Sequence, residues 1–156
     1  PEAVDLPDDA RQDPTWFRTQ GERYGRDGCR VPIPWQAGAP AAGFSPTGAS
    51  WLPQPAGWDA YARDVQRDDP QSTLNLYTQL LELRRAQKLG SGTLQWLQTE
   101  DPRLLAFTNA GVVVVANFAD HPLPLPAEAR ELSALVASSL QEAGSIAGES
   151  TIWLAR

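Results

Sequence analysis

The sequence predicts an α+β chain in which an irregular first part precedes one helix and a small antiparallel β-domain. Residues 1–70 hold ten of the 14 prolines, seven of the 12 glycines and four of the six tryptophans. Residues 72–90 place apolar side chains at helical spacing, and from residue 92 onward apolar and polar residues alternate as they do in strands. The chain is therefore expected to divide into residues 1–70, 71–90 and 91–156.

Residues 1–70 are predicted to form an ordered but irregular segment. Closely spaced prolines deny it a long helix or a central strand. A disordered tail rarely carries so many aromatic residues, and a long structureless loop is unusual in a compact domain. We therefore expect these aromatics to pack against a scaffold that this sequence does not contain: Trp16, Phe17, Tyr24, Trp35, Phe44, Trp51, Trp58 and Tyr61. Short helical turns are predicted around Asp8–Arg11 and Gly57–Arg63.

One regular helix is predicted after Pro70. Ser72 can cap its N-terminus, near which Asp68 and Asp69 also favour the positive end of the helix dipole. An apolar stripe follows at helical spacing, formed by Leu74, Tyr77, Leu80 and Leu81. Gly90 is expected to supply the left-handed residue that ends the helix.

The remaining residues are predicted to form an antiparallel β-domain. The expected strands are Thr93–Leu97, Arg103–Thr108, Val112–Phe118 and Thr151–Ala155. Glu131–Ser138 is compatible with either a strand or a helix, and we favour a strand. The sequence Asn109-Ala110-Gly111 indicates a hairpin turn between two of them. Leu123 and Leu125 alternate with prolines, which is typical of an edge strand or a polyproline segment. Trp96 and Trp153 are expected to be buried, and Asn117 is expected to bond backbone groups at a strand end.

Composition excludes several classes of function. Nineteen acidic and 13 basic residues give a net charge of −6 without a basic stripe, which argues against nucleic acid and anionic membranes as partners. No apolar run is long enough to span a bilayer. One cysteine, Cys29, and one histidine, His121, leave no set of soft ligands for a metal centre. We therefore expect no metal, no cofactor and no membrane.

A motif in the first segment identifies a family. Residues 25–35 read Gly-Arg-Asp-Gly-Cys-Arg-Val-Pro-Ile-Pro-Trp, which resembles the Arg-Asp-Gly-x-Arg-x-Pro-x-x-Trp signature of α-glucosidases in the α-amylase superfamily. Residues 5–14, 43–46 and 51–53 continue the likeness. The helix at Leu74–Leu89 is similar to the last barrel helix of these enzymes, and residues 105–118 resemble their C-terminal β-domain.

The resemblance implies an architecture and an activity. The chain would supply the last loop and helix of a (β/α)₈ barrel, followed by an antiparallel β-sandwich. The family performs retaining hydrolysis of α-glucosidic bonds in short oligosaccharides, which needs two carboxylates about 5 Å apart. In the family these lie upstream of the part that matches here, so we expect no catalytic residue in this chain and no activity from it alone. Its expected partners are an α-glucoside oligosaccharide and the N-terminal barrel portion, in the cytoplasm.

Three residues of the motif are the candidate substrate-binding residues. The resemblance implies that Arg30 holds sugar hydroxyls in the glucose subsite, a role that suits the planar fork of a guanidinium. Its alternative role is a salt bridge that fixes the loop. Asp27 would orient Arg30 or bridge Arg26, and Arg26 itself is a weaker candidate. Trp35 either stacks on sugar or packs under the loop.

Two other functions stay open at this point. A transglycosylating relative, such as a trehalose synthase, shares the same signature. The chain is alternatively a non-catalytic remnant that serves as a structural or interaction module. A sequence that begins with Pro1 and holds no methionine fits a piece of a longer polypeptide.

Overall fold

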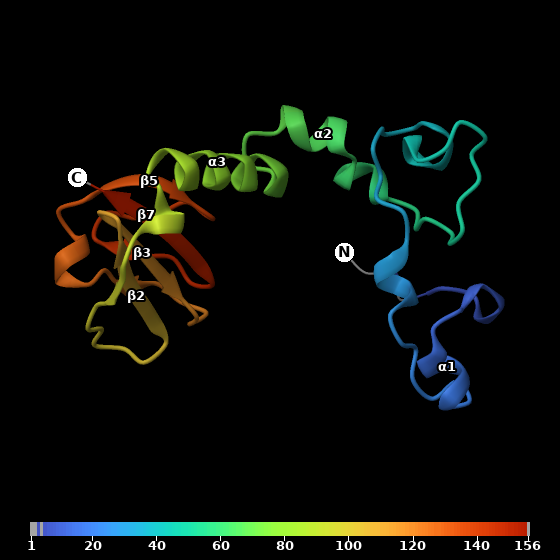
Figure 1. The fold of residues 1–156 in the computed structure, drawn as a ribbon, viewed down its shortest axis with the longest axis horizontal. Helices are drawn as coiled ribbons and strands as arrows, with labels where there is room; N and C mark the ends of the chain where they lie inside the picture. The colour runs from blue at the N-terminus through green and yellow to red at the C-terminus, as the bar shows by residue number, and fades with distance from the viewer. Residues whose placement is uncertain (1–2, 4, 156) are drawn as a thin grey trace. The chain divides into compact units, whose positions relative to one another are not determined.

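A computed structural model of the chain describes residue 3 and residues 5–155. The chain divides into two compact units, Pro1–Leu74 and Asn75–Arg156. Figure 1 shows the first unit in blue to green and the second in green to red.

Short helical segments build the first unit. They are η1 (Asp8–Ala10), α1 (Pro14–Arg18), η2 (Asp27–Arg30), η3 (Pro40–Gly43), η4 (Trp58–Tyr61) and α2 (Arg63–Asp68). The described residues of this unit contain no strand. The turns predicted around Asp8–Arg11 and Gly57–Arg63 are confirmed. The helix α1 was not predicted, although Asp13 caps it and Pro14 occupies its first turn.

The core of the first unit is small. Four apolar residues are buried together, Ala3, Leu6, Val31 and Leu52, with Ala10 and Trp58 packed against them. Large apolar side chains remain exposed on the same unit: Phe17, Tyr24, Ile33, Trp35, Trp51 and Tyr61. Trp35 is 50% exposed, so this chain by itself does not bury it under the loop. Most of the aromatic surface of the unit is thus outside its core.

The helix α3 covers Thr73–Ala86, within the range predicted from the apolar stripe. None of its described residues is buried in this chain. The residue with left-handed backbone after the helix is Lys88, at φ 53°, and Gly90 has no positive φ. The prediction for Gly90 was wrong because the chain turns two residues earlier, where the Lys88 N–H donates to the carbonyl of Arg85. The short helix η5 (Leu89–Ser91) follows.

The second unit is built on an antiparallel sheet with the strand order β1-β2-β3-β7-β5. The strands are β1 (Leu94–Trp96), β2 (Leu104–Asn109), β3 (Val112–Asn117), β5 (Ser133–Ala137) and β7 (Ser150–Ala155). A separate pair joins β4 (Leu123–Pro124) to β6 (Ser145–Ile146), and η6 (Ala127–Ala129) lies between β4 and β5. The strand β6 was not predicted, because two residues are too few to show a period.

The hairpin between β2 and β3 has the predicted turn. Asn109 pairs with Val112, and Ala110 and Gly111 form the two-residue loop between them. Both loop residues have positive φ, 49° and 83°. This combination matches the right-handed twist of the adjoining strands.

Apolar residues cover both faces of the main sheet. One face carries the larger core, which includes Leu104, Val115, Ile146, Ile152 and Leu154. The other face carries a smaller cluster of Leu89, Val112 and Val114, with Phe107, Leu135 and Trp153 packed against it. Trp96 is 65% exposed and meets Phe107 edge to face at 5.6 Å, so the prediction that Trp96 is buried was wrong. It lies on β1, the edge strand, where no further strand covers it.

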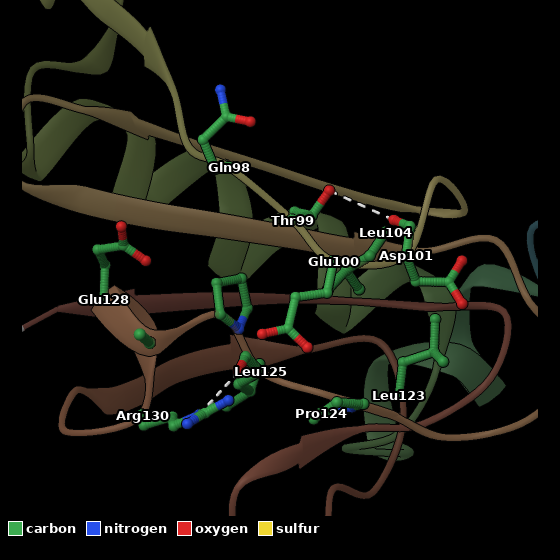
Figure 2. Close-up of a pocket in the computed structure, with 12 residues that line it drawn as sticks. Gln98, Thr99, Glu100, Asp101, Leu104, Leu123, Pro124, Leu125, Glu128 and Arg130 are labelled. Carbon is green, nitrogen blue, oxygen red and sulfur yellow. Dashed lines mark hydrogen bonds between the residues drawn. The ribbon is translucent and has the colours of Figure 1, made fainter.

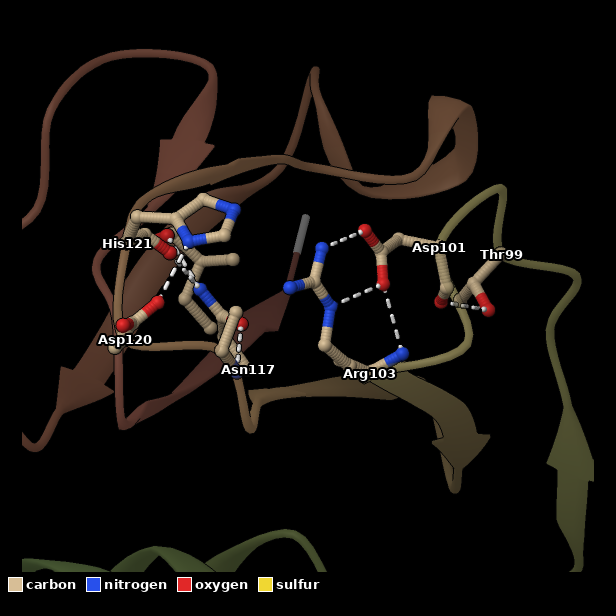
Figure 3. Close-up of polar contacts among 8 residues, drawn as sticks. Thr99, Asp101, Arg103, Asn117, Asp120 and His121 are labelled. Carbon is tan, nitrogen blue, oxygen red and sulfur yellow. Dashed lines mark hydrogen bonds and ion pairs between the residues drawn. The ribbon is translucent and has the colours of Figure 1, made fainter.

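Asn117, at the end of β3, holds two loops of the second unit together. Its side-chain amide donates to the carbonyls of His121 at 2.9 Å, Ile146 at 3.2 Å and Ala147 at 3.0 Å. Its side-chain oxygen accepts from the N–H of Ala119 at 2.8 Å. Figure 3 shows Asn117 beside Asp120 and His121. The prediction that Asn117 bonds backbone groups at a strand end is confirmed.

Candidate functional site

Asp27 and Arg30 of the motif meet Asp13, which lies outside the motif, in the first unit. Arg30 Nη2 lies 3.1 Å from Asp13 Oδ2, and Arg30 Nη1 lies 3.4 Å from Asp27 Oδ1. Asp13 precedes α1, and η2 carries both Asp27 and Arg30. We call these three residues the Asp13–Asp27–Arg30 cluster. It brings the residue that precedes α1 together with two residues of η2, across the loop that joins these helices.

Two backbone hydrogen bonds and one ion pair hold the Asp13 carboxylate. Its Oδ1 caps α1 by accepting from the Thr15 N–H at 2.8 Å, its Oδ2 accepts from the Arg26 N–H at 3.1 Å, and the same Oδ2 forms an ion pair with Arg30 Nη2 at 3.1 Å. The residue is only 3% exposed. The backbone hydrogen bonds from Thr15 and Arg26, together with the charge of Arg30, lower the pKa of Asp13 to about 2. Asp13 is therefore a carboxylate at any physiological pH.

Asp27 is fixed just as firmly. It is 2% exposed, and its Oδ2 accepts from the N–H groups of Gln12 at 2.9 Å and Asp13 at 2.8 Å. Its other oxygen faces Arg30. Of the two roles predicted for Asp27, the structure contains the contact with Arg30, whereas Arg26 lies nearer to Asp13, with Nε 3.9 Å from Oδ2.

The Arg30 side chain is bound by two carboxylates and is still partly exposed to solvent. Its side chain is 42% exposed although it contacts two buried carboxylates. Its carbonyl accepts from Trp51 Nε1 at 2.9 Å, which fixes the backbone from a second side. A guanidinium has five N–H donors, so those not directed at Asp13 and Asp27 remain able to bind a ligand. The Arg26 side chain is 80% exposed and is much less constrained.

Sequence reasoning missed Asp13 and Arg11. Asp13 followed by Pro14 is a helix-start signal, and this signal could have identified it. Arg11 is 6% exposed, donates to the carbonyl of Leu6 at 2.8 Å, and lies 4.2 Å from the ring centroid of Tyr24 and 4.9 Å from that of Trp16. No local sequence pattern indicates that Arg11 contacts Trp16 and Tyr24, because these rings reach Arg11 only through the fold of the loop.

The second unit contains a pocket of about 270 Å³. Its apolar residues include three buried leucines, Leu104, Leu123 and Leu125. Figure 2 shows Glu100, Glu128 and Arg130 among its polar residues, and Arg130 Nε donates to the carbonyl of Leu125 at 3.0 Å. The lining includes no aromatic ring on which a sugar could stack, and no imidazole or thiol.

A polar group lies near the start of β2. Arg103 binds Asp101 through two side-chain contacts, at 3.0 and 2.7 Å, and this lowers the pKa of Asp101 to about 2. His121 lies 2.8 Å from Asp120, whose pKa is also lowered by that contact. Figure 3 shows the two pairs. Ion pairs this close to solvent contribute little to stability, and neither pair forms a candidate site.

The part of the chain that the structure describes holds neither a cluster of metal-binding side chains nor a membrane-spanning helix. Among residue 3 and residues 5–155, no three histidine, cysteine, aspartate or glutamate side chains are grouped so that they could hold a metal ion. Cys29 is exposed and forms no disulfide. Within the same range, every helix is too short or too polar to cross a membrane.

Comparison with known proteins relates the chain to a family. Residues 4–92 match the family described as alpha amylase, catalytic domain. A probable alpha-glucosidase of Rhizobium meliloti (strain 1021) is 36% identical over 89 residues, which is 56% of this chain and 16% of the relative. Oligo-1,6-glucosidase of Parageobacillus thermoglucosidasius is 28% identical over 101 residues, 62% of this chain and 18% of the relative. This chain thus spans less than a quarter of either relative.

Solved structures extend the likeness to the second unit. The alpha-glucosyl transfer enzyme XgtA superposes with a TM-score of 0.75 at 30% identity, covering 99% of this chain and 30% of that one. A mutant of the trehalulose synthase MutB in complex with Tris gives a TM-score of 0.74 at 18% identity, covering 99% and 33%. The predicted resemblance and fold class are confirmed, and the chain belongs to the alpha-amylase family, in which its relatives include alpha-glucosidases and oligo-1,6-glucosidases.

Proposed function

We propose that this chain works as part of a retaining glycoside hydrolase that cleaves the α-glucosidic bonds of short oligosaccharides. In this proposal it contributes a substrate-pocket arginine and a C-terminal β-domain, but no catalytic carboxylate. The observation that carries the proposal is Arg30, which is held by two buried carboxylates and keeps 42% of its side chain exposed. An arginine that served only to fix the loop would be expected to direct more of its donors inward.

The chemistry of the Asp13–Asp27–Arg30 cluster suits a neutral sugar. Two carboxylates within 3.4 Å offset the positive charge of Arg30, so the group is a better donor to hydroxyl oxygens than an anchor for an anion. Asp27 would orient Arg30 through the contact between its Oδ1 and Arg30 Nη1. Arg26, with its 80% exposed side chain, would contact the ligand only at the rim.

The catalytic pair would come from elsewhere. Retaining hydrolysis needs a nucleophile and an acid/base whose carboxyl groups lie about 5 Å apart. Asp13 and Asp27 are both occupied by backbone N–H groups and by Arg30, which leaves neither free to attack an anomeric carbon or to donate a proton. We therefore expect the catalytic carboxylates on a barrel portion of the same enzyme. This chain alone would be inactive.

The exposed aromatics give that barrel portion a place to bind. Trp35, Trp51 and Tyr61 expose between 48% and 62% of their surface, whereas the unit's own core is formed by four small or medium apolar residues. Exposed tryptophan and tyrosine side chains are enriched at interaction surfaces. The proposal assigns this surface to contact with the barrel.

The test is hydrolysis of an aryl α-glucoside by the full polypeptide that contains this chain. Arg30→Ala is expected to lower kcat/KM by roughly 10- to 100-fold, the size of one lost charged hydrogen bond. Arg23→Ala, at an exposed position of the same loop, is the matched control and should leave kcat/KM unchanged. If kcat/KM of Arg30→Ala equals that of the unchanged protein, Arg30 does not bind substrate and the proposal is wrong.

Transfer of a glucosyl group is the second candidate. It is favoured by the 30% identity to XgtA, described as an alpha-glucosyl transfer enzyme. Incubation of the full polypeptide with maltose separates the two activities. Hydrolysis yields glucose alone, whereas transfer also yields new di- and trisaccharides from the first minutes.

A further inference from the structure

We propose that Asp13 is the positioning residue that sets the orientation of Arg30 before a ligand arrives. This inference rests on the proposed role of Arg30 in the substrate pocket. Asp13 lies outside the Arg-Asp-Gly motif and reaches it only through the fold. It would touch no substrate and would act entirely through Arg30.

The first line of support is that Asp13 has no freedom of its own. Its Oδ1 is engaged by the Thr15 N–H at 2.8 Å, and its Oδ2 by the Arg26 N–H at 3.1 Å. With a side chain only 4% exposed, it cannot turn toward solvent without giving up both bonds. The carboxylate is thus a fixed acceptor, set by the first turn of α1, and the 3.1 Å contact places Arg30 Nη2 against it.

The second line of support is that the two carboxylates fix each other. Asp27 Oδ2 accepts from the backbone N–H of Asp13 at 2.8 Å, while Asp27 Oδ1 faces Arg30 Nη1 at 3.4 Å. The backbone of Asp13 therefore positions Asp27, and the side chain of Asp13 positions Arg30. Both terminal nitrogens of the guanidinium are restrained from this one residue. A free arginine side chain loses rotamer entropy when a ligand orders it, and an arginine already held in place loses less.

The third line of support is the backbone opposite Asp13. Gly25 has φ +71°, and a β-carbon built there would lie 2.5 Å from Asp13 Cγ and 2.7 Å from Oδ1. A distance below 3.0 Å is a clash, so only glycine lets the chain pass this close to the carboxylate. Gly25 is the residue that brings the N–H of Arg26 within reach of Asp13.

The experiment is a double-mutant cycle in the full polypeptide. Asp13→Asn retains a capping side chain for α1 but removes the charge that holds Arg30. We expect Asp13→Asn to lower kcat/KM about tenfold, mainly through a higher KM, in the otherwise unchanged protein. In the Arg30→Ala background the same substitution should have no further effect, since nothing remains for Asp13 to position. Asp8→Asn is the charge-matched control, because Asp8 is an exposed carboxylate that pairs with Arg11 and does not contact Arg30.

The outcomes separate this inference from the proposal beneath it. If Arg30→Ala is active like the unchanged protein, the proposed role of Arg30 fails. If Arg30→Ala loses activity but Asp13→Asn does not, or if Asp13→Asn costs the same in both backgrounds, Arg30 keeps its role and Asp13 is merely structural. Asp13→Ser, also a good N-cap, is run in parallel and replaces Asp13→Asn should the latter not fold.

Discussion

Gly25 and Asp13 touch so closely that no other residue type fits opposite the carboxylate. A β-carbon at position 25 would fall 2.5 Å from Asp13 Cγ. The backbone there also has a left-handed φ of +71°, which costs any residue with a side chain about 1 kcal/mol or more. Steric and conformational requirements therefore coincide at this position.

Substitution of Gly25 separates these two requirements. Gly38 has almost the same backbone, with φ +69°, but no atom within 4 Å of its would-be β-carbon. Gly38→Ala is expected to lower the free energy of unfolding by about 1 kcal/mol. Gly25→Ala is expected to lower it by about 1–3 kcal/mol more, because a clash is added to the strain. Denaturant unfolding of both variants measures the difference, and equal losses would show that the contact with Asp13 carries no weight.

The pH dependence of stability is expected to reflect Asp13. Its pKa is lowered in the folded chain from 3.8 to about 2 by backbone hydrogen bonds and by Arg30. A lowered folded pKa means that the stabilisation is complete above the unfolded value and is lost as pH falls through the folded value. The stability difference between the unchanged chain and Asp13→Asn should therefore be constant above about pH 5 and should shrink from pH 4 to pH 2. Thermal unfolding across this range checks it, and a difference that stays constant down to pH 2 contradicts it.

Loss of Asn117 is expected to destabilise the second unit. Asn117→Ala would leave the carbonyls of Ile146 and Ala147 without this donor and the N–H of Ala119 without this acceptor. Because Asn117 is only 2% exposed, the unsatisfied backbone groups should lower the free energy of unfolding by about 3 kcal/mol in total. Gln95→Ala, on the exposed edge strand β1, should change the free energy of unfolding by less than about 0.5 kcal/mol. Denaturant titration distinguishes them, and a near-neutral Asn117→Ala would refute the role of Asn117 as the link between two loops.

The hairpin turn offers opposite predictions at neighbouring positions. Ala110 has a φ of 49°, which glycine adopts more readily, so Ala110→Gly should preserve stability or raise it by up to about 1 kcal/mol. Gly111 has a φ of 83°, so Gly111→Ala should lower stability by about 1 kcal/mol. Thermal unfolding of the two variants gives the answer. Losses of the same sign and size in both would mean that the turn type is not what stabilises the hairpin.

The fold was predictable where neighbours in the chain decide the conformation. The hairpin, the strands β2, β3 and β7, and the helix α3 each show a local period or a turn signal, whereas the segment of β5 was compatible with a strand or a helix. Predictions failed where packing decided. Trp96 stays exposed because β1 is an edge strand. The left-handed residue after the helix is Lys88 and not Gly90, because the chain turns two residues earlier than predicted.

The candidate site divides in the same way. Arg30, Asp27 and Arg26 could be selected from the motif, and the contact between Asp27 and Arg30 spans only three residues. Asp13 could not be assigned to them, because its distance from Arg30 depends on the path of the loop from α1 to η2.

By itself, the amino-acid sequence determined the family, the α+β class, the hairpin and the candidate arginine, since each depends on residue types at short and regular spacing. Only the tertiary structure decided that Asp13 caps a helix with one oxygen and holds Arg30 with the other. The physical reason is that a buried carboxylate takes its partners from whatever the folded chain brings within about 3 Å, and residues distant along the chain come that close only through the fold.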